Sequence, residues 1–199
     1  MLKLLIATGN LGKLREIQAL LAGLEVELLL PAALGLELQV VEDGQTYREN
    51  ASLKAVAYAH ASGLISLADD SGLEVDAIGG LPGLHSARFS PLPGATDADR
   101  RQHLLQELAG KPRPWYAHFH CTVALANPQG RVWFTDGDCP GEIIPTERGS
   151  NGFGYDPIFL VSELGKTMAE LSMEEKNRLS HRARAVLAAR PLIEKLCYD

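Results

Sequence analysis

The chain has 199 residues, of which 46% are hydrophobic and 22% charged, as is usual for a globular protein of one domain or two lobes. Its 19 Lys and Arg against 25 Asp and Glu give a formal net charge of −6, which excludes a diffuse basic surface for nucleic acid. The longest apolar stretch, residues 28–36, is interrupted by proline and glycine and is too short to span a bilayer. We therefore expect a protein that binds neither nucleic acid nor membrane.

Cysteine usage indicates the compartment. The three cysteines are odd in number and form no CxxC pair, which argues against a disulfide framework and a structural zinc site. This pattern fits a reducing environment, so we expect a cytoplasmic protein. The residues are Cys121, Cys139 and Cys197.

The N-terminal third predicts alternating strands and helices. Residues 3–8 form an expected buried strand, and apolar side chains from Leu14 to Leu21 recur at helical spacing. A second strand is expected over residues 26–30. Residues 47–62 predict the next helix, which Gly63 ends.

The middle of the chain predicts one strand and one helix. Residues 64–68 form an apolar strand that runs directly into the sequence Asp69-Asp70-Ser71-Gly72. Thr96 has the character of an N-cap for a helix that reaches about Ala109, because two aspartates follow in its first turn.

The last third predicts a hairpin, a long loop and two helices. Strands over 116–126 and 131–135 flank an Asn-Pro-Gln-Gly turn, and a polar, glycine-rich loop follows over 145–157. Ser172 begins a capping-box pattern, and a last helix starts near Ser180, with Pro191 marking a kink or an end. The whole predicts a mixed α/β chain without independent domains, with two lobes around one sheet and a cleft between them.

The first candidate site is the segment from Thr8 to Lys13, at the end of a strand and the start of a helix. Unpaired backbone N–H groups and the positive end of the helix dipole favour an anion there. Gly9 and Gly12 are too close for a Walker A loop, and an ordinary turn with a surface lysine is the alternative.

Acidic residues supply the second candidate. Asp69 and Asp70 follow a buried strand, where a divalent cation such as Mg²⁺ would relieve their repulsion. Adjacent strand residues point to opposite faces, so both need not contact one ion. Glu42 precedes the helix that carries Asn50 and Lys54, and it could join Asp70 at a metal. A solvated acidic turn and a solvated helix face are the alternatives.

The C-terminal half contributes aromatic and basic candidates. Phe153 and Tyr155 lie between glycines in a polar loop, where they could support a planar ring or simply pin the loop to the core. Lys176, His181 and Arg182 could donate to a phosphate or a base carbonyl, or belong to an ordinary capped helix. His118 and His120 are interpreted as strand histidines, and no G-x-S-x-G elbow or activated cysteine supports triad chemistry.

Taken in order, these motifs resemble one family along nearly the whole chain, from residue 3 to about residue 190. It is the inosine/xanthosine triphosphate pyrophosphatase family, which hydrolyses noncanonical purine nucleotides. The motifs are Thr8-Gly9-Asn10…Lys13, Glu42, Glu49-Asn50-Ala51…Lys54, Asp69-Asp70-Ser71-Gly72, Gly80-Leu81-Pro82-Gly83, Phe153-Gly154-Tyr155-Asp156-Pro157 and Glu175-Lys176-Asn177…Ser180-His181-Arg182. Each is weak alone, but all of them in one order and at fitting spacing are highly specific.

The resemblance implies a homodimer of elongated α/β subunits, each one domain over residues 1–199 with its active site in a cleft between two lobes. It implies Mg²⁺-dependent hydrolysis of ITP, dITP and XTP to the monophosphate and pyrophosphate. Glu42 and Asp70 would bind the metal, Asp70 would also accept a proton from water, and Ser71 would contact substrate, with Asp69, Asn50 and Lys54 in support. The triphosphate would bind Thr8, Gly9, Asn10, Leu11, Gly12 and Lys13, and the base would be enclosed by Phe153, Gly154, Tyr155, Asp156, Lys176, His181 and Arg182.

Two other functions remain open at this stage. One is a pyrophosphatase of the same architecture that acts on pyrimidine nucleotides. The other is a nucleotide-binding module without catalysis, against which the intact pair of Glu42 and Asp70 argues.

Overall fold

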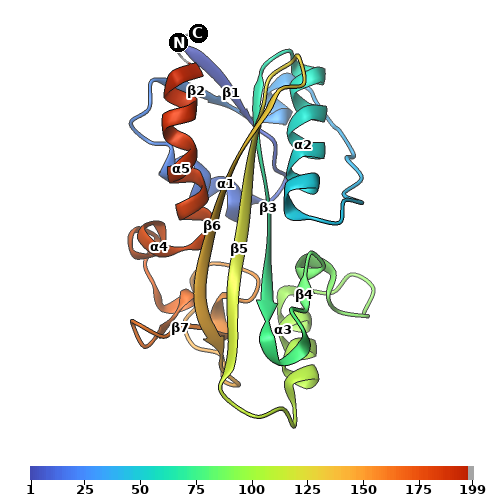
Figure 1. Ribbon diagram of the computed structural model, residues 1–199, viewed down its shortest axis with the longest axis vertical. Helices are drawn as coiled ribbons and strands as arrows, with labels where there is room; N and C mark the ends of the chain where they lie inside the picture. Colours follow the sequence, from blue (N-terminus) through green and yellow to red (C-terminus); the bar gives the residue numbers. More distant parts are fainter. Residues whose placement is uncertain (197–199) are drawn as a thin grey trace. The chain divides into compact units, whose positions relative to one another are not determined.

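A computed structural model describes residues 1–196 as a mixed α/β fold around one sheet (Figure 1). The sheet has the strand order β2-β1-β3-β5-β6-β7-β8, and β4 pairs with β3 outside this path. Strand β1 pairs in parallel with β2 and β3, whereas the pairs β3–β4, β6–β7 and β7–β8 are antiparallel. The predicted α/β class is therefore confirmed.

The elements have the following bounds. The strands are β1 (Leu2–Ile6), β2 (Val26–Leu29), β3 (Ile65–Val75), β4 (Pro82–Gly83), β5 (Trp115–Ala126), β6 (Val132–Ile143), β7 (Phe159–Val161) and β8 (Lys166–Thr167). The α-helices are α1 (Leu11–Leu20), α2 (Tyr47–Ser62), α3 (Asp97–Leu108), α4 (Met173–Leu179) and α5 (His181–Leu196). Short 3₁₀ helices cover Pro31–Leu34, Asp76–Ile78, Ser86–Arg88, Asp156–Ile158 and Met168–Glu170.

The described chain divides into two compact units. Unit 1 contains residues 1–70 and 121–137 and the chain from residue 182 onward, and unit 2 contains residues 71–120 and 138–181. The chain passes from one unit to the other within the long strands β3, β5 and β6 and at the junction of α4 and α5. The prediction of one domain over residues 1–199 stays a prediction.

Unit 1 has a different core on each face of its strands. On one face, large side chains such as Leu67 and Val123 pack with α1 and α5. On the other face, α2 packs on the sheet (Figure 1), and the fully buried side chains there are small, with Val132 partly buried against them. These buried alanines are Ala7, Ala51, Ala55, Ala59, Ala68, Ala124 and Ala126. Because strand residues alternate between faces, this pattern lets α2 lie close to the sheet.

Unit 2 has its own apolar core. Residues from β3, α3, β5, β6 and β7 meet there, including Leu73, Leu104 and Ile143. The rings of Phe119 and Phe159 lie 4.5 Å apart between centroids, a distance at which tilted aromatic rings attract each other. Each unit therefore buries an apolar core of its own.

Several predicted boundaries agree with the structure. Helix α2 covers the predicted residues 47–62, and Thr46 forms a capping box with Glu49 at its start. Thr96 and Ser172 likewise cap α3 and α4, as their sequence patterns predict. Local side-chain chemistry decides these helix starts, so the sequence alone can locate them.

Other boundaries were predicted wrongly. The strand expected at 64–68 continues as β3 to Val75, so Asp69 and Asp70 lie inside a strand rather than just past its end. The second hairpin strand extends to Ile143. Of the two outcomes expected at Pro191, an end of the helix is excluded, because α5 continues to Leu196. Strand pairing and packing decide these lengths, and neither is visible in the local sequence. Cys197 lies outside the described residues, within which no helix is both long and apolar enough to cross a membrane.

Enlarging one alanine on the α2 face that packs on the sheet should destabilise unit 1. Ala55 is fully buried, so Ala55→Leu should lower the free energy of unfolding by about 1–3 kcal/mol through overpacking. The same change at the exposed Ala61 on this helix is the matched control and should have little effect. Urea denaturation measures both, and equal effects would contradict the close packing of α2.

Candidate functional site

The pleat of β3 separates two adjacent carboxylates. Asp69 follows Leu67 on the face covered by α1 and α5, and Asp70 follows Ala68 on the face covered by α2. Both carboxylates are largely buried. Each therefore meets a different set of partners, as the alternation of strand side chains predicts.

Asp69 belongs to a buried network of charges. Its Oδ2 lies 3.0 Å from Lys13 Nζ and accepts a hydrogen bond of 3.1 Å from Arg182 Nε. Arg182 Nη1 also donates to Glu16 Oε2 at 2.5 Å. Two basic and two acidic side chains thus balance one another. Burial raises the pKa of Asp69, but the charges of Lys13 and Arg182 outweigh it and hold the pKa well below its usual range.

Asp70 has polar partners from α2. Asn50 Nδ2 donates to Asp70 Oδ2 at 3.2 Å, and Lys54 Nζ lies 3.9 Å from Asp70 Oδ1. Burial raises the pKa of Asp70, and the nearby positive charges of Lys54 and Lys13 offset only part of that effect. The carboxylate at position 70 is therefore a stronger base than an exposed aspartate.

Lys54 joins Asp70 to Glu42. Its Nζ donates to Glu42 Oε2 at 2.8 Å, so both carboxylates approach one position occupied by a cationic group. Mg²⁺ prefers hard oxygen ligands and commonly takes one or two carboxylates together with substrate phosphates. The pair therefore fits such an ion, although no cluster of three or more His, Cys, Asp or Glu suited to a metal occurs within residues 1–196.

Asn50 fixes the segment that carries Glu42. Its Oδ1 accepts a hydrogen bond from the Gly44 backbone N–H at 2.9 Å. A Cβ at Gly44 would lie 2.6 Å from Glu49 Cβ, so this close approach requires glycine. Glu49 itself accepts hydrogen bonds from the backbone N–H groups of Gln45 and Thr46 and caps α2. Asn50 is thus a structural link between Asp70 and the Glu42 segment.

A pocket of about 490 Å³ connects these residues with the N-terminal motif. Lys13, Glu42 and Lys54 all line it, so two basic groups and one acidic group face one hollow. Its lining consists of Ala7, Thr8, Gly9, Asn10, Lys13, Leu38, Gln39, Val40, Glu42, Lys54 and Tyr58. Asp70 meets this lining through Lys54.

The N-terminal motif differs from its prediction in one respect. Asn10 is the N-cap of α1, and its Oδ1 accepts hydrogen bonds from the N–H groups of Gly12 and Lys13 at 2.8 and 3.1 Å. The expectation that these two amides are unpaired is therefore wrong, because the asparagine side chain satisfies them first. Leu11, which is 67% exposed, does not line the pocket.

Gly9 lies on the pocket without a structural need for glycine. Its φ is not positive, and a Cβ there would meet no atom of the described chain within 4 Å. The absent side chain leaves the backbone open to the hollow, which is the arrangement that lets an anion approach main-chain N–H groups.

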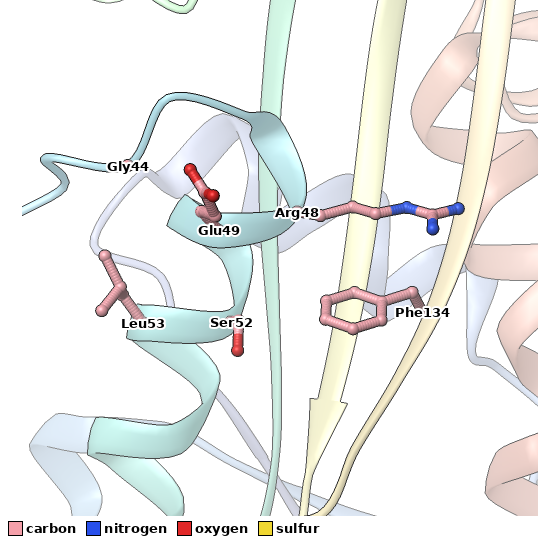
Figure 2. A pocket seen from close by; sticks show the side chains of 6 residues that line it. All are labelled: Gly44, Arg48, Glu49, Ser52, Leu53 and Phe134. Atoms are coloured by element: carbon pink, nitrogen blue, oxygen red, sulfur yellow. The ribbon is translucent and has the colours of Figure 1, made fainter.

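A second pocket in unit 1, of about 410 Å³, lies between the start of α2 and Phe134 of β6 and is mainly apolar (Figure 2). Arg48 extends from α2 past Phe134, with its Cζ 5.7 Å from the ring centroid, and pairs with Asp136 at 2.5 Å. Gly44, Glu49, Ser52 and Leu53 complete the lining. None of the residues predicted to bind metal or phosphate lines this second pocket.

The aromatic and basic candidates of unit 2 form another group. Lys176 Nζ donates to Asp156 Oδ2 at 2.6 Å, and both side chains are buried. The same carboxylate oxygen accepts from the Phe153 N–H at 2.9 Å, and Lys176 Nζ lies 5.1 Å from the Phe153 ring centroid. The structure thus brings Phe153, Asp156 and Lys176 together as a ring beside a buried cation.

Tyr155 and His181 are anchored elsewhere in unit 2. The Tyr155 hydroxyl donates to the Ser86 carbonyl at 2.9 Å, and burial raises the pKa of this phenol above its usual value. His181 stacks on Phe119 with 4.6 Å between ring centroids. Tyr155 therefore pins the loop to the core, which was one of the two sequence interpretations.

Some predicted groupings are not observed within either unit. Arg182 is grouped by sequence with Lys176 and His181, but its guanidinium pairs with Asp69 and Glu16 in unit 1. Ser71 is half-buried in β3 and begins unit 2. His118 and His120 pair with Glu74 and Asp138, at 3.4 and 2.7 Å, as strand histidines with acidic neighbours.

Three residues that hold these groups in place were not predicted from the sequence: Glu16, Asp97 and Arg101. Glu16, which neutralises Arg182, lies 166 positions before its partner, and no local pattern announces that contact. Asp97 and Arg101 of α3 hydrogen-bond the backbone of Gly154, although the sequence indicated only that Asp97 stabilises a helix start. Their one signal is an acidic and a basic residue four positions apart, which is common on helices.

Comparison with known proteins places this geometry in a class. Two solved structures share the fold. A HAM1 protein from Coxiella burnetii has a TM-score of 0.89 and 39% sequence identity, and the match covers 98% of this chain and 100% of that one. The Ham1 protein of Staphylococcus aureus has a TM-score of 0.86 and 36% sequence identity, and the match covers 98% of this chain and 99% of that one. The class is therefore that of the Ham1 proteins.

Sequence comparison gives the same assignment. The Ham1 family model matches residues 4–192, so the chain belongs to the Ham1 family. Proteins named dITP/XTP pyrophosphatase from Geobacter sulfurreducens and Nostoc are 49% and 48% identical to it, each over 94% of this chain and over 94% and 92% of their own lengths. The family predicted from the ordered motifs is confirmed.

Removing Arg182 should destabilise unit 1. Arg182→Met leaves the buried carboxylates of Asp69 and Glu16 without their shared cation, and we expect a loss of about 3–5 kcal/mol in the free energy of unfolding. Arg178→Met, which removes an exposed pair with Glu174, is the matched control and should change little.

The pH dependence gives a second check on Arg182→Met. The pKa of Asp69 is lower in the folded than in the unfolded chain, so its ionised form stabilises the fold above the unfolded pKa and loses that effect as the pH falls. The stability difference from the wild type should narrow below about pH 4. Urea denaturation of both proteins at several pH values measures this difference. A difference in the free energy of unfolding that stayed constant with pH would contradict the prediction.

Proposed function

We propose that this protein hydrolyses noncanonical purine nucleoside triphosphates (ITP, dITP and XTP) to the monophosphate and pyrophosphate, with Mg²⁺ as the metal. One structural observation carries the proposal: Lys13, Glu42 and Lys54 line one hollow, and Lys54 links them to Asp70. Family membership and the names of the relatives support the same activity.

Unit 1 would bind the triphosphate. Thr8, Gly9 and Asn10 expose main-chain and polar groups to the pocket, and Lys13 and Lys54 supply positive charge. A triphosphate carries about four negative charges, and its hydrolysis is accelerated chiefly by positioning and by cations at the phosphoryl oxygens. Glu42 and Asp70 would hold Mg²⁺, which when bound supplies charge neutralisation and polarises the phosphoryl group.

Asp70 would act as the base. It would accept a proton from the water whose oxygen forms the new bond to the α-phosphorus, while the bond from that phosphorus to the bridging oxygen breaks. The electron pair would leave with pyrophosphate, whose charge Lys13 would stabilise. Before a metal binds, burial raises the pKa of Asp70, which favours proton acceptance by this carboxylate. Asn50 and Lys54 would keep the carboxylate oriented.

Unit 2 would read the base. The Phe153 ring would stack on the purine, Tyr155 and Asp156 would hold the loop, and Lys176 and His181 would donate to the 6-keto oxygen that adenine lacks. Ser71 and Arg182 would join the substrate contacts, as the resemblance implies. An adenine amine would leave buried donors facing each other, which strongly disfavours binding.

We also propose a cytoplasmic homodimer. The free thiol of Cys121 supports a reducing compartment, and burial raises the pKa of this thiol, so it is not an activated nucleophile. Sedimentation of the purified protein tests the dimer: a mass of one chain at micromolar concentration would exclude it.

A nucleotide panel tests the selectivity. We expect kcat/KM for pyrophosphate release from dITP and XTP to exceed that from ATP by about 100-fold or more, because only the 6-keto purines satisfy the donors. GTP should also be a poor substrate, on account of its 2-amino group. Equal rates on all four would remove the selectivity claim, and binding of dITP without pyrophosphate release would favour a non-catalytic module.

Asp70→Asn tests the base. The amide cannot accept the proton, so kcat with dITP should fall by about 10²–10⁴-fold with an unchanged melting temperature. Asp43→Asn makes the same change at an exposed carboxylate beside Glu42 and should leave kcat unchanged. Near-normal turnover of the Asp70 variant would refute the assignment.

A further inference from the structure

Two side chains of α3 hold both backbone polar groups of a single residue, Gly154, in the aromatic loop. Asp97 Oδ2 accepts a hydrogen bond from the Gly154 N–H at 2.7 Å, and Arg101 Nη1 donates to the Gly154 carbonyl at 2.8 Å. Asp97 and Arg101 are one helical turn apart, so both reach the same side of α3. We call this pair the α3 clamp.

Arg101 also binds a second point of the same loop. Its Nε and Nη2 donate to the two carboxylate oxygens of Glu147 at 2.8 and 3.0 Å. One planar guanidinium thus serves a carboxylate and a carbonyl at fixed angles, which the single ammonium of a lysine cannot reproduce. Arg100 pairs with Asp97 and donates to the Ala95 carbonyl at 2.7 Å, which fixes Asp97 in turn.

Gly154 is the point where the loop needs external support. Its φ is +61°, a left-handed conformation that glycine adopts without strain, and a Cβ there would meet nothing within 4 Å. The position that a side chain would occupy is therefore open, and this residue separates the anchored Tyr155 from the half-buried Phe153. The hydrogen bonds of the clamp hold its backbone.

We propose that Asp97 and Arg101 are positioning residues for base recognition. They hold Gly154, and through it the Phe153 ring, in the conformation that receives the purine. This inference rests on the proposed function, because it assigns the Phe153 ring to the base. Without the clamp the loop must be ordered on binding, so the cost falls on substrate affinity rather than on the chemical step.

The test is Arg101→Lys, which keeps the positive charge but removes the planar guanidinium and its set of N–H donors. We expect KM for dITP to rise about tenfold while kcat stays within about twofold of the wild type. In the protein without nucleotide, backbone amides of residues 149–155 should exchange hydrogen faster. Arg113→Lys makes the same substitution at an exposed arginine of unit 2 and should change neither quantity.

Asp97→Asn is the second variant. It weakens the contact to the Gly154 N–H without touching Arg101, and it should raise KM and amide exchange in the same direction. Faster exchange with unchanged KM, or a fall in kcat at constant KM, would overturn the proposal. If the wild type released no pyrophosphate from dITP, the proposed function would fail. If the backbone amides of residues 149–155 exchanged hydrogen at the wild-type rate in both variants, the role of the α3 clamp would be refuted, whatever the function of the protein.

Discussion

Adjacent carboxylates repel each other and lose hydration when they are buried, and β3 buries two of them, Asp69 and Asp70. The pleat resolves the conflict because it turns them to opposite faces of the strand. Asp69 is neutralised by Lys13 and Arg182, and Asp70 keeps weaker partners on α2. One strand thus supplies an anchor whose pKa is lowered and, one residue later, a carboxylate whose pKa is raised. The difference between neighbours is what a site with a separate base requires.

The small side chains on the α2 face make this arrangement possible. Alanines on both α2 and the strands shorten the distance between helix and sheet, so the moderate-length side chain of Asn50 reaches Asp70 directly. The same asparagine accepts from the Gly44 backbone and so carries the Glu42 segment toward Lys54. The packing of α2 therefore sets the positions of the candidate metal and base residues. In unit 2, the aromatic loop is held from within by Asp156 and from without by the α3 clamp.

Local signals explain what could be predicted. Capping residues such as Thr46 and Ser172 satisfy the N–H groups of their own helix, so their pattern locates α2 and α4 without tertiary information. The same local chemistry misled the prediction at Asn10, whose side chain takes up the amides that were expected to bind an anion. The length of β3 was underestimated because an acidic pair in a strand is unfavourable until distant cations compensate it.

The sequence by itself determined the α/β class, most helix starts, the family and the identity of the candidate groups, because these depend on short-range patterns and on motifs in a fixed order. Tertiary structure alone decided which groups meet. Arg182 pairs with Glu16 and Asp69, and Gly154 depends on Asp97 and Arg101, across separations of 53 to 166 positions. Buried charges must be paired, but the rule does not say with which partner. Only the folded backbone brings one particular opposite charge within reach.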